Sequence, residues 1–328
     1  MDEPEPEPRK IRHLVLSGGG EVGICFFGAL KTSNQEGFWR IEDIKTIYAT
    51  SAGSLFGTVT ALTPFVSWEM LDVFFEKRPW EQVFNVNVDC VLSSVANCGI
   101  LGRRTAAEFL SPVLRAADLS IDVTMREFFD ATGIEMHYMA TNLDSFELVD
   151  ISYKSHPNWK VVEAVYASCA LPIMFQPIRI EGVLYADGAI FCNFPIKQCL
   201  AQADHPDEIL AFQKVDLEKQ ATAEATDAAK AGINDNTDAV PGPQNLLTYL
   251  GNILTKLLYS VSREKDHGSL IRHVVRFPSN LTNAFDIYRS AAECSYRLQL
   301  RQLGIDTWNE FKMNLDLSAL KDVSSSTE

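Results

Sequence analysis

Hydrophobic runs separated by small residues recur along the first part of the chain. Ile11–Leu16 is a short apolar run typical of a buried strand, and a serine and three glycines interrupt it. Ile24–Gln35 has the pattern of a helix and is followed by Gly37, a common helix stop. Ile44–Ala49 repeats the strand signal, and Ser54–Leu62 predicts a second helix. This strand–helix–strand–helix order predicts a parallel sheet with helices on its faces.

The remaining elements follow the same patterns as far as Val215. Helices are expected over Phe65–Arg78, Thr105–Ala117 and Asn158–Ser168. Strands are expected over Glu135–Asn142, Phe146–Ser152 and Glu208–Val215. Thr124 and Glu127 have capping-box spacing, which predicts the start of a further helix. Arg179–Ala186 predicts a hairpin that turns at Glu181–Gly182.

Composition changes in the last third of the chain, and the two ends differ from the middle. Met1–Lys10 is a Pro-Glu repetition, which predicts a disordered acidic tail. Asp216–Pro243 is rich in Ala, Asp, Thr and Asn, which predicts a long surface excursion. Asn245–His267 has a broad apolar face at helical spacing and is either a core helix or a lid that contacts lipid. Leu270–Phe277 predicts a last strand and Ala284–Leu303 a last helix, so residues 11–320 are expected to form one domain.

Charge and cysteine content narrow the classes of partner. The 328 residues carry 43 acidic and 29 basic side chains, for a net charge of -14. This balance argues against nucleic acid and against electrostatic docking on anionic membranes, because both need clusters of Lys and Arg. Seven scattered cysteines without Cys-x-x-Cys spacing argue against structural zinc and a disulfide framework. With no signal peptide and no run of about 18 apolar residues, we expect a cytoplasmic protein that meets membranes peripherally, through apolar surface.

A serine stands at the junction between the second predicted strand and its helix. The run Ala49-Thr50-Ser51-Ala52-Gly53 approximates the Gly-x-Ser-x-Gly pattern of a nucleophile elbow, in which small neighbours permit a sharp turn. The helix that follows points its N-terminal amides at this place, and those amides favour developing negative charge. Taken alone, the pattern also fits a serine that merely caps the helix.

A glycine-rich segment follows the first predicted strand. Gly18, Gly19, Gly20 and Gly23 fit two hypotheses. Consecutive glycines expose backbone amides and allow close approach of a substrate carbonyl, as in an oxyanion hole. The spacing also fits the Gly-x-Gly-x-x-Gly pattern of dinucleotide binding. That site needs an acidic residue at the carboxyl end of the second strand, however, and this chain has Ser51 there.

The third motif is a carboxylate at the end of the predicted hairpin. Asp187 is followed by Gly188 and Ala189, which permit a turn. Considered on its own, this pattern favours a turn aspartate. Asp187 becomes a candidate catalytic residue because it follows the other two motifs in the chain.

In combination, the glycine-rich loop, the serine elbow about 30 residues later and the distant Asp-Gly-Ala resemble the motifs of patatin-like phospholipases. The likeness extends to Ala167–Pro172, Phe175–Pro177 and Asn193–Pro195, and it covers roughly Ile11–Asp216. The resemblance implies a three-layer α/β/α fold with a mainly parallel central sheet. It also implies hydrolysis of fatty-acyl esters in phospholipids or other lipids by a Ser-Asp dyad.

The resemblance also assigns roles to individual residues. Ser51 matches the nucleophile, Asp187 the general base, and Gly18, Gly19 and Gly20 the oxyanion loop. Asp187 would accept the proton of Ser51 as the serine attacks the ester, and water would later hydrolyse the acyl-serine. This scheme needs no metal and no cofactor. The expected partner is a lipid or phospholipid substrate, met in transient contact with a membrane surface.

Two positions depart from the family pattern. Val22 stands where family members usually carry Arg or Lys, and Ala49 replaces the first glycine of the elbow. A missing cation weakens the expected oxyanion site, although its backbone donors remain. A catalytically impaired, patatin-like interaction protein is therefore an alternative to the lipid hydrolase.

Histidine supplies the second alternative. The chain order Ser51, Asp187 and His273 also fits a Ser-His-Asp esterase of the α/β-hydrolase type. Yet His273 lies inside the predicted strand Leu270–Phe277, whereas a catalytic histidine is expected in a loop. His13, also in a predicted strand, is expected to be structural, and the other four histidines are expected at the surface.

Overall fold

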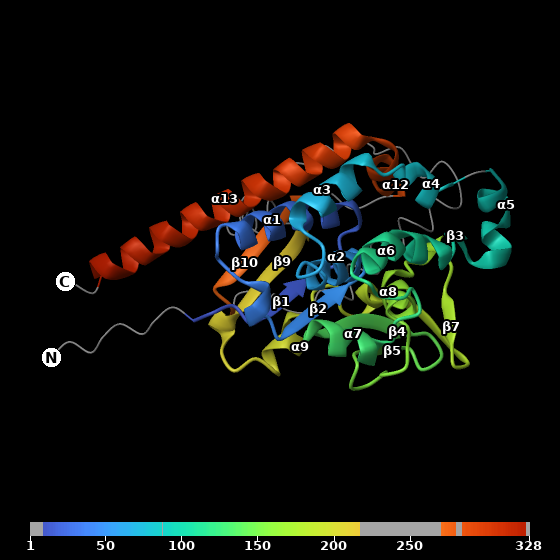
Figure 1. Cartoon of the computed structure of the whole chain (residues 1–328), viewed down its shortest axis with the longest axis horizontal. Coiled ribbons are helices and arrows are strands. Elements are labelled where there is room, and N and C mark those ends of the chain that lie inside the picture. The colour runs from blue at the N-terminus through green and yellow to red at the C-terminus, as the bar shows by residue number, and fades with distance from the viewer. Residues whose placement is uncertain (1–8, 87, 217–269, 280–283, 326–328) are drawn as a thin grey trace, which may run out of the picture.

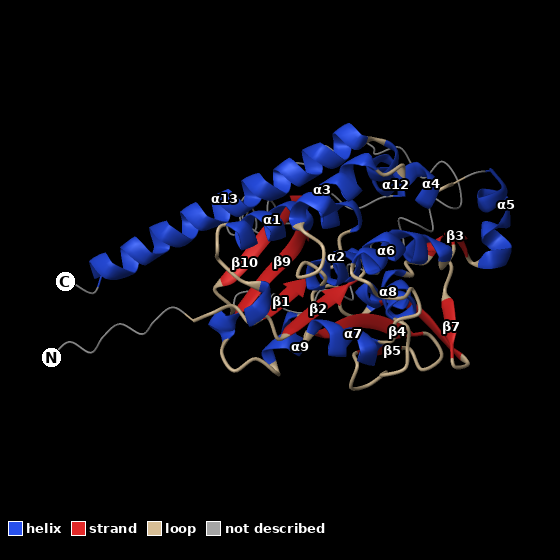
Figure 2. Ribbon diagram, in the orientation of Figure 1, coloured by secondary structure: helices blue, strands red, loops and turns tan. Residues whose placement is uncertain are grey.

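A central sheet with helices on both faces organises the chain (Figures 1 and 2). The computed structural model describes residues 9–86, 88–216, 270–279 and 284–325. The strands run in the order β10 (His273–Ser279), β9 (Ile209–Asp216), β1 (His13–Leu16), β2 (Thr46–Thr50), β4 (Glu135–Asn142), β8 (Val183–Asp187) and β7 (Ile178–Ile180). The first five are parallel to one another, whereas β8, β7 and β5 (Glu147–Ile151, beside β4) are antiparallel to their neighbours. The three-layer, mainly parallel fold expected from the sequence is confirmed.

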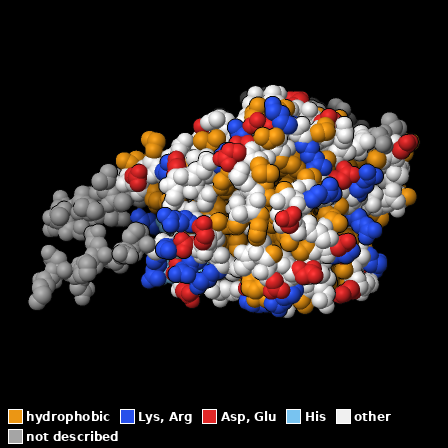
Figure 3. Space-filling view, in the orientation of Figure 1, with side chains coloured by type: hydrophobic (Ala, Val, Ile, Leu, Met, Phe, Trp, Pro, Cys, Tyr) orange, Lys and Arg blue, Asp and Glu red, His pale blue; other side chains and the backbone are white. Residues whose placement is uncertain are grey.

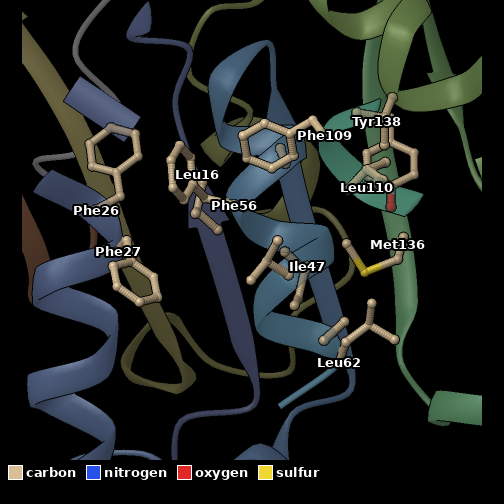
Figure 4. Packing of buried hydrophobic residues seen from close by; sticks show 14 of the residues in the cluster. Leu16, Phe26, Phe27, Ile47, Phe56, Leu62, Phe109, Leu110, Met136 and Tyr138 are labelled. Atoms are coloured by element: carbon tan, nitrogen blue, oxygen red, sulfur yellow. The ribbon is translucent and has the colours of Figure 1, made fainter. Parts of the chain in front are cut away.

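Alternation along the strands divides their apolar residues between two cores, because successive side chains point to opposite faces of a sheet. Leu16 and Ile47 face the larger core, together with Phe26 of α1 (Gly23–Gln35) and Phe56 of α2 (Ala52–Ala61) (Figure 4). Tyr48 points the other way, into a smaller core that includes Ile196 and Cys199 of α9 (Ile196–Leu200). Strands buried on both faces explain the nearly continuous apolar runs in the sequence.

The other helices cover the larger core or extend from it (Figure 1). They are α3 (Trp68–Lys77), α4 (Trp80–Val83), α5 (Val88–Asn97), α6 (Arg104–Ala116), α7 (Met125–Thr132), α8 (Val161–Cys169), α12 (Ala284–Ala292) and α13 (Cys294–Ser325). Short 3-10 helices are η1 (Gly20–Val22), η2 (Ile41–Asp43), η3 (Gly188–Ile190) and η4 (Pro206–Glu208). The long α13 lies along α1, where Gly28 packs on the Arg301 backbone and Gly304 on that of Cys25.

Most predicted elements are present within a few residues of their expected bounds. The predicted capping box opens α7, with Thr124 Oγ1 accepting the Glu127 N–H at 3.2 Å and Glu127 Oε2 accepting the Thr124 N–H at 2.9 Å. The predicted hairpin is β7 and β8. The sequence patterns missed β3 (Gly99–Leu101) and β6 (Ile173–Phe175), which form a separate two-stranded sheet, because three residues carry no periodic signal.

The single last helix predicted over Ala284–Leu303 is wrong, because α12 and α13 are separate helices. Arg297 explains the break. Its guanidinium donates to the carbonyl oxygens of Ser290 and Ala291, at 3.0 and 2.8 Å, at the end of α12. An arginine that satisfies the last carbonyls of a helix favours its termination there.

Three predictions lie outside the described residues: the tail as far as residue 8, the excursion at 217–243, and the lid or core helix at 245–267. In the described part of the chain, no helix is both long enough and apolar enough to cross a bilayer.

Candidate active site

Ser51 occupies a strained turn between β2 and α2. Its φ of 53° and ψ of -125° lie where residues with side chains rarely go, at a cost of roughly 1–3 kcal/mol. Gly53 allows the turn to be this tight, since a Cβ there would lie 2.6 Å from the Leu16 oxygen and 2.7 Å from that of Ser17. Ala49 is buried in the larger core, so its methyl group packs without blocking the turn. The local geometry is that of the predicted nucleophile elbow.

Strand register places Asp187 beside Ser51. Thr50 at the end of β2 lies opposite Met139 of β4, and the next residue, Ala140, lies opposite Asp187 of β8. Ser51 and Asp187 therefore leave the sheet at the same level, with only β4 between them.

The Asp187 side chain is fully buried. Its Oδ1 accepts the Ala189 N–H at 2.8 Å, and its backbone oxygen accepts the Thr141 hydroxyl at 2.8 Å. Burial raises the pKa of Asp187 to about 7, although the Ala189 amide and the Ser51 hydroxyl both favour the ionised form. No hydrogen bond of ordinary length and angle reaches Oδ2 from the described residues. Oδ2 is therefore the oxygen of this carboxyl that has no hydrogen-bond partner within the described residues.

The glycine-rich loop is tied to the segment that follows Asp187. The Gly18 N–H donates to the Asn193 oxygen at 2.9 Å, and Asn193 Nδ2 donates back to the Gly18 oxygen at 3.3 Å. A Cβ at Gly18 would clash with Asn193 Oδ1 and lie 3.2 Å from Ser51 Cβ. Thr50 Oγ1 donates to the Cys192 oxygen at 2.8 Å. The three motifs therefore meet in one place, and Asn193 joins them.

These contacts narrow the set of oxyanion donors. The Gly18 N–H donates to the Asn193 oxygen, so it is already engaged. Gly20 has a φ of +58° at the start of η1 and Ala52 is the first residue of α2. Their N–H groups have no hydrogen-bond partner within the described part of the chain. Unengaged N–H groups at the start of a helix are available to bind an anion.

Three further residues of the predicted motifs lie where they pack against neighbouring elements. Gly23 begins α1 and packs against the Phe56 ring, and Gly188 packs on the Met139 backbone. Val22, in place of the family's cation, is buried in the larger core. An apolar side chain suits that position because an unpaired charge there would be costly.

His273 does not join the site. It begins β10 opposite Leu210, and its ring meets Phe38 edge-on at 5.3 Å. β10 lies three strands away from β2, and Ser51 follows the far end of β2. In the described chain no hydrogen bond or ion pair joins a histidine to Ser51 or Asp187. His273 therefore forms no Ser-His-Asp triad with Ser51 and Asp187.

Two other histidines are part of the sheet. His13 Nδ1 lies 2.8 Å from Thr46 Oγ1 in a buried pair, as its predicted structural role requires. The expectation that His137 lies at the surface is wrong, because it is 2% exposed and stacks on Tyr48 at 4.0 Å. Burial lowers the pKa of His137, but hydrogen bonds to Asp150 and Glu135 outweigh this and raise it. Its place in the middle of the long predicted strand was the signal for burial.

We expect His273→Ala to retain substantial esterase activity, because His273 lies far from Ser51 along the sheet. The rate on one short-chain ester should stay within a few-fold of the parent rate in protein whose folding is checked by circular dichroism. A loss of several orders of magnitude in the folded variant would instead support a Ser-His-Asp triad.

No group of three or more His, Cys, Asp or Glu side chains that could hold a metal ion occurs among the described residues.

Comparison with known proteins relates this chain to lipid hydrolases. Residues 14–200 match the family described as patatin-like phospholipase. The chain is 26% identical to probable lipid hydrolase 463L of Invertebrate iridescent virus 6 over 194 residues, which cover 58% of this chain and 63% of that protein. It is 26% identical to triacylglycerol lipase ptl3 of Schizosaccharomyces pombe over 166 residues, 50% of this chain and 33% of that one.

The chain thus spans less than two thirds of the length of these relatives. Among solved structures, that of VipD from Legionella pneumophila has a TM-score of 0.47 at 14% identity, covering 94% of this chain and 67% of VipD.

The family match includes the glycine-rich loop, Ser51 and Asp187, and it extends over more than half of the 328 residues. The chain belongs to the patatin-like phospholipase family.

Proposed function

We propose that this protein is a lipid acyl hydrolase of the phospholipase A type, which cleaves fatty-acyl esters through an acyl-Ser51 intermediate with Asp187 as the general base. The observation that carries the proposal is the pairing of a serine in a strained elbow with a buried carboxyl whose pKa is about 7. A base with a pKa near the working pH is largely ionised and still binds a proton readily, and both properties are needed to accept the serine proton. The lipid hydrolases among the relatives support the same class of substrate.

The reaction uses one proton acceptor twice. Ser51 Oγ attacks the ester carbonyl while its proton moves to Asp187 Oδ2, and the N–H groups of Gly20 and Ala52 stabilise the oxyanion. Collapse of the intermediate breaks the ester C–O bond, and the leaving alcohol takes the proton from Asp187. Water then attacks the acyl-serine, gives its proton to Asp187, and releases the fatty acid as Ser51 recovers that proton. Every step is a proton transfer or an acyl transfer between groups already in place.

An apolar cavity of about 390 Å³ is available for an acyl chain. Its lining residues are Phe84, Val86, Ile100, Leu101, Met174, Ile287 and Tyr288. Two links connect the cavity to the catalytic residues. α12, which supplies Ile287, contacts η1 of the glycine loop. Met174 is four residues beyond Ala170, whose oxygen accepts the Asp187 N–H, and four extended residues span at most about 14 Å.

Exposed apolar residues near this cavity offer a surface for lipid. Leu92 and Val95 of α5 are 74% and 81% exposed, and α5 contacts β3, which lines the cavity. Figure 3 shows further hydrophobic side chains grouped in the middle of one face, with charged side chains around them. With a net charge of -14, contact with a membrane should depend on this apolar surface more than on charge.

We expect Met174→Trp to shift the preference toward shorter acyl chains, because the larger side chain fills part of the cavity. Each methylene denied burial costs about 0.8 kcal/mol, so losing two or three should lower kcat/KM for a palmitoyl ester roughly 15- to 60-fold. The measurement is kcat/KM across a series of p-nitrophenyl esters from butyrate to palmitate. Met313→Trp on the exposed side of α13 is a matched control that should leave the series unchanged. An unaltered chain-length profile in Met174→Trp would place the acyl chain elsewhere.

A fluorophosphonate probe tests the proposed function directly. An activated serine attacks the phosphorus and expels fluoride, so the parent protein should label on the peptide that contains Ser51. A panel of phospholipids, lysolipids and neutral glycerides should then reveal acyl release, with the head group read from the products. A folded parent protein that neither labels nor releases fatty acid would support the interaction-protein alternative.

A further inference from the structure

Three consecutive residues at the end of α8 each bond a backbone group of Ser51 or Asp187. Ser168 Oγ accepts the Ser51 N–H at 3.0 Å. The Cys169 thiol donates to the Ser51 oxygen at 3.0 Å, and the Ala170 oxygen accepts the Asp187 N–H at 3.0 Å. These contacts join parts of the chain that are far apart in sequence, and they converge on the two residues of the dyad.

The end of α8 is rigidly placed. Ser168 is fully buried and Cys169 is 8% exposed. Ser168 Oγ also lies 2.8 Å from Ser54 Oγ in α2, so it connects the elbow to the helix that follows. Pro172 comes shortly after, and a helix rarely continues into the residue before proline. The helix therefore ends where its last side chains can reach Ser51.

Both backbone groups of Ser51 are thus held by side chains. A residue in a sparsely populated conformation persists only where its surroundings over-determine it. The N–H and the oxygen of Ser51 bond adjacent residues at the end of α8, and the oxygen also accepts the Ser54 N–H at 2.8 Å. The end of α8 and the first turn of α2 therefore orient the peptide planes on each side of the serine together. Because Ala170 holds the Asp187 amide in the same way, a shift of this segment would move both catalytic residues.

We propose that Ser168–Ala170 is a positioning segment that holds Ser51 in its strained conformation and sets its spacing from Asp187, an inference that rests on the proposed function. Ser168 and Cys169 act through Ser51 and do not touch the substrate. Burial raises the pKa of the Cys169 thiol well above its usual range, so the sulfur keeps its proton and remains a donor to the Ser51 oxygen. The thiol has a positioning role and is not a second nucleophile.

The kinetic test compares variants that lack these hydrogen-bonding side chains with one that keeps a donor. Ser168→Ala and Cys169→Ala should each lower kcat about 10- to 100-fold with little change in KM, because small misplacements of a catalytic group have effects of this size. The rate of fluorophosphonate labelling at Ser51 should fall in parallel. Cys169→Ser keeps a donor at the same place and should recover most of the rate.

Matched controls separate positioning from loss of packing. Cys199→Ala removes a buried thiol from the smaller core, and Ser33→Ala removes a buried hydroxyl from α1. Both should label at the parent rate. Unchanged kcat in folded Ser168→Ala and Cys169→Ala, or equal loss in the two controls, would overturn the proposal.

Hydrogen exchange provides a readout that does not need activity. In Ser168→Ala, the amides of the segment 50–54 should exchange faster, while those of β1 and β9 keep the parent rate. If the parent protein fails to label, the proposed function is wrong, and this exchange measurement alone decides about the segment. If Ser168→Ala fails to fold, Cys169→Ala and Cys169→Ser test the positioning role instead. Their kcat and the hydrogen exchange of residues 50–54 are then the two measurements. Unchanged exchange at 50–54 contradicts the positioning role.

Discussion

Asp187→Asn is expected to lower the turnover number nearly as far as loss of Ser51 does, and to stabilise the folded protein at alkaline pH. An amide cannot accept the serine proton, and no histidine among the described residues bonds Ser51 or Asp187 and could replace the carboxylate. The two catalytic residues act as one unit, so the double variant should be little slower than either single one. A rate above about a tenth of the parent value, a barrier change under about 1.4 kcal/mol, would exclude Asp187 as the base.

Asp187→Asn should lower activity but raise the free energy of unfolding, because a buried carboxylate destabilises the folded protein when it is ionised. Folding raises the pKa of Asp187 from 3.8 to about 7. Well below pH 3.8 the group is protonated in both states, and its burial costs nothing. As pH rises from 4 to 7, the unfolded chain ionises first and the folded protein loses stability, by a total on the order of 4 kcal/mol.

Denaturant unfolding of the parent and of Asp187→Asn at pH 4 and pH 8 measures this effect. The difference in free energy of unfolding should be several kcal/mol at pH 8 and close to zero at pH 4. If the two proteins differed in free energy of unfolding by the same amount at pH 4 and pH 8, Asp187 would not be buried in its ionised form. The pH dependence of parent activity gives an independent check, since kcat should rise as Asp187 ionises around pH 7.

Ser51→Ala is expected to abolish ester hydrolysis while leaving the fold intact. Removal of the nucleophile closes the covalent route and leaves only oxyanion stabilisation, which corresponds to a loss of about 10⁴-fold or more. Hydrolysis of a short-chain ester at the parent rate would show that Ser51 is not the nucleophile.

Ser51→Gly separates chemistry from strain at the same position. Both variants should be inactive, but glycine tolerates a φ of 53° far better than alanine does. We therefore expect Ser51→Gly to unfold at higher denaturant than Ser51→Ala, by about 1 kcal/mol in the free energy of unfolding. Equal stability of the two would mean that the elbow relaxes in solution.

Local patterns were sufficient to predict much of this fold. Strands such as β1 and β2 are buried along their whole length and mostly apolar, and the residues that follow them are small. Both the parallel sheet and the serine elbow could therefore be inferred. The break before α13 could not be, because it depends on where the long Arg297 side chain reaches in three dimensions.

The candidate site residues could be proposed from the sequence, but the residues that position them could not. Ser51 and Asp187 are recognisable by residue type and by the glycines near them. Ser168 is not, because a serine near the end of a helix is unremarkable until strand pairing brings it to Ser51, 117 residues away in sequence. Asn193 is similar, since its bond to Gly18 spans 175 residues. Contacts that depend on tertiary arrangement leave no local periodic signal.

The pairing of α1 with α13 bears on how the protein can be dissected. The recognisable family region ends at residue 200, yet β9 covers one edge of β1, and α13 covers α1 directly behind the glycine loop. A fragment cut at residue 200 would leave an unpaired strand edge and a bare helix face, both of which promote aggregation. For gene fusions and truncations, the unit that folds is therefore longer than the unit that is recognised, and the cut belongs beyond α13.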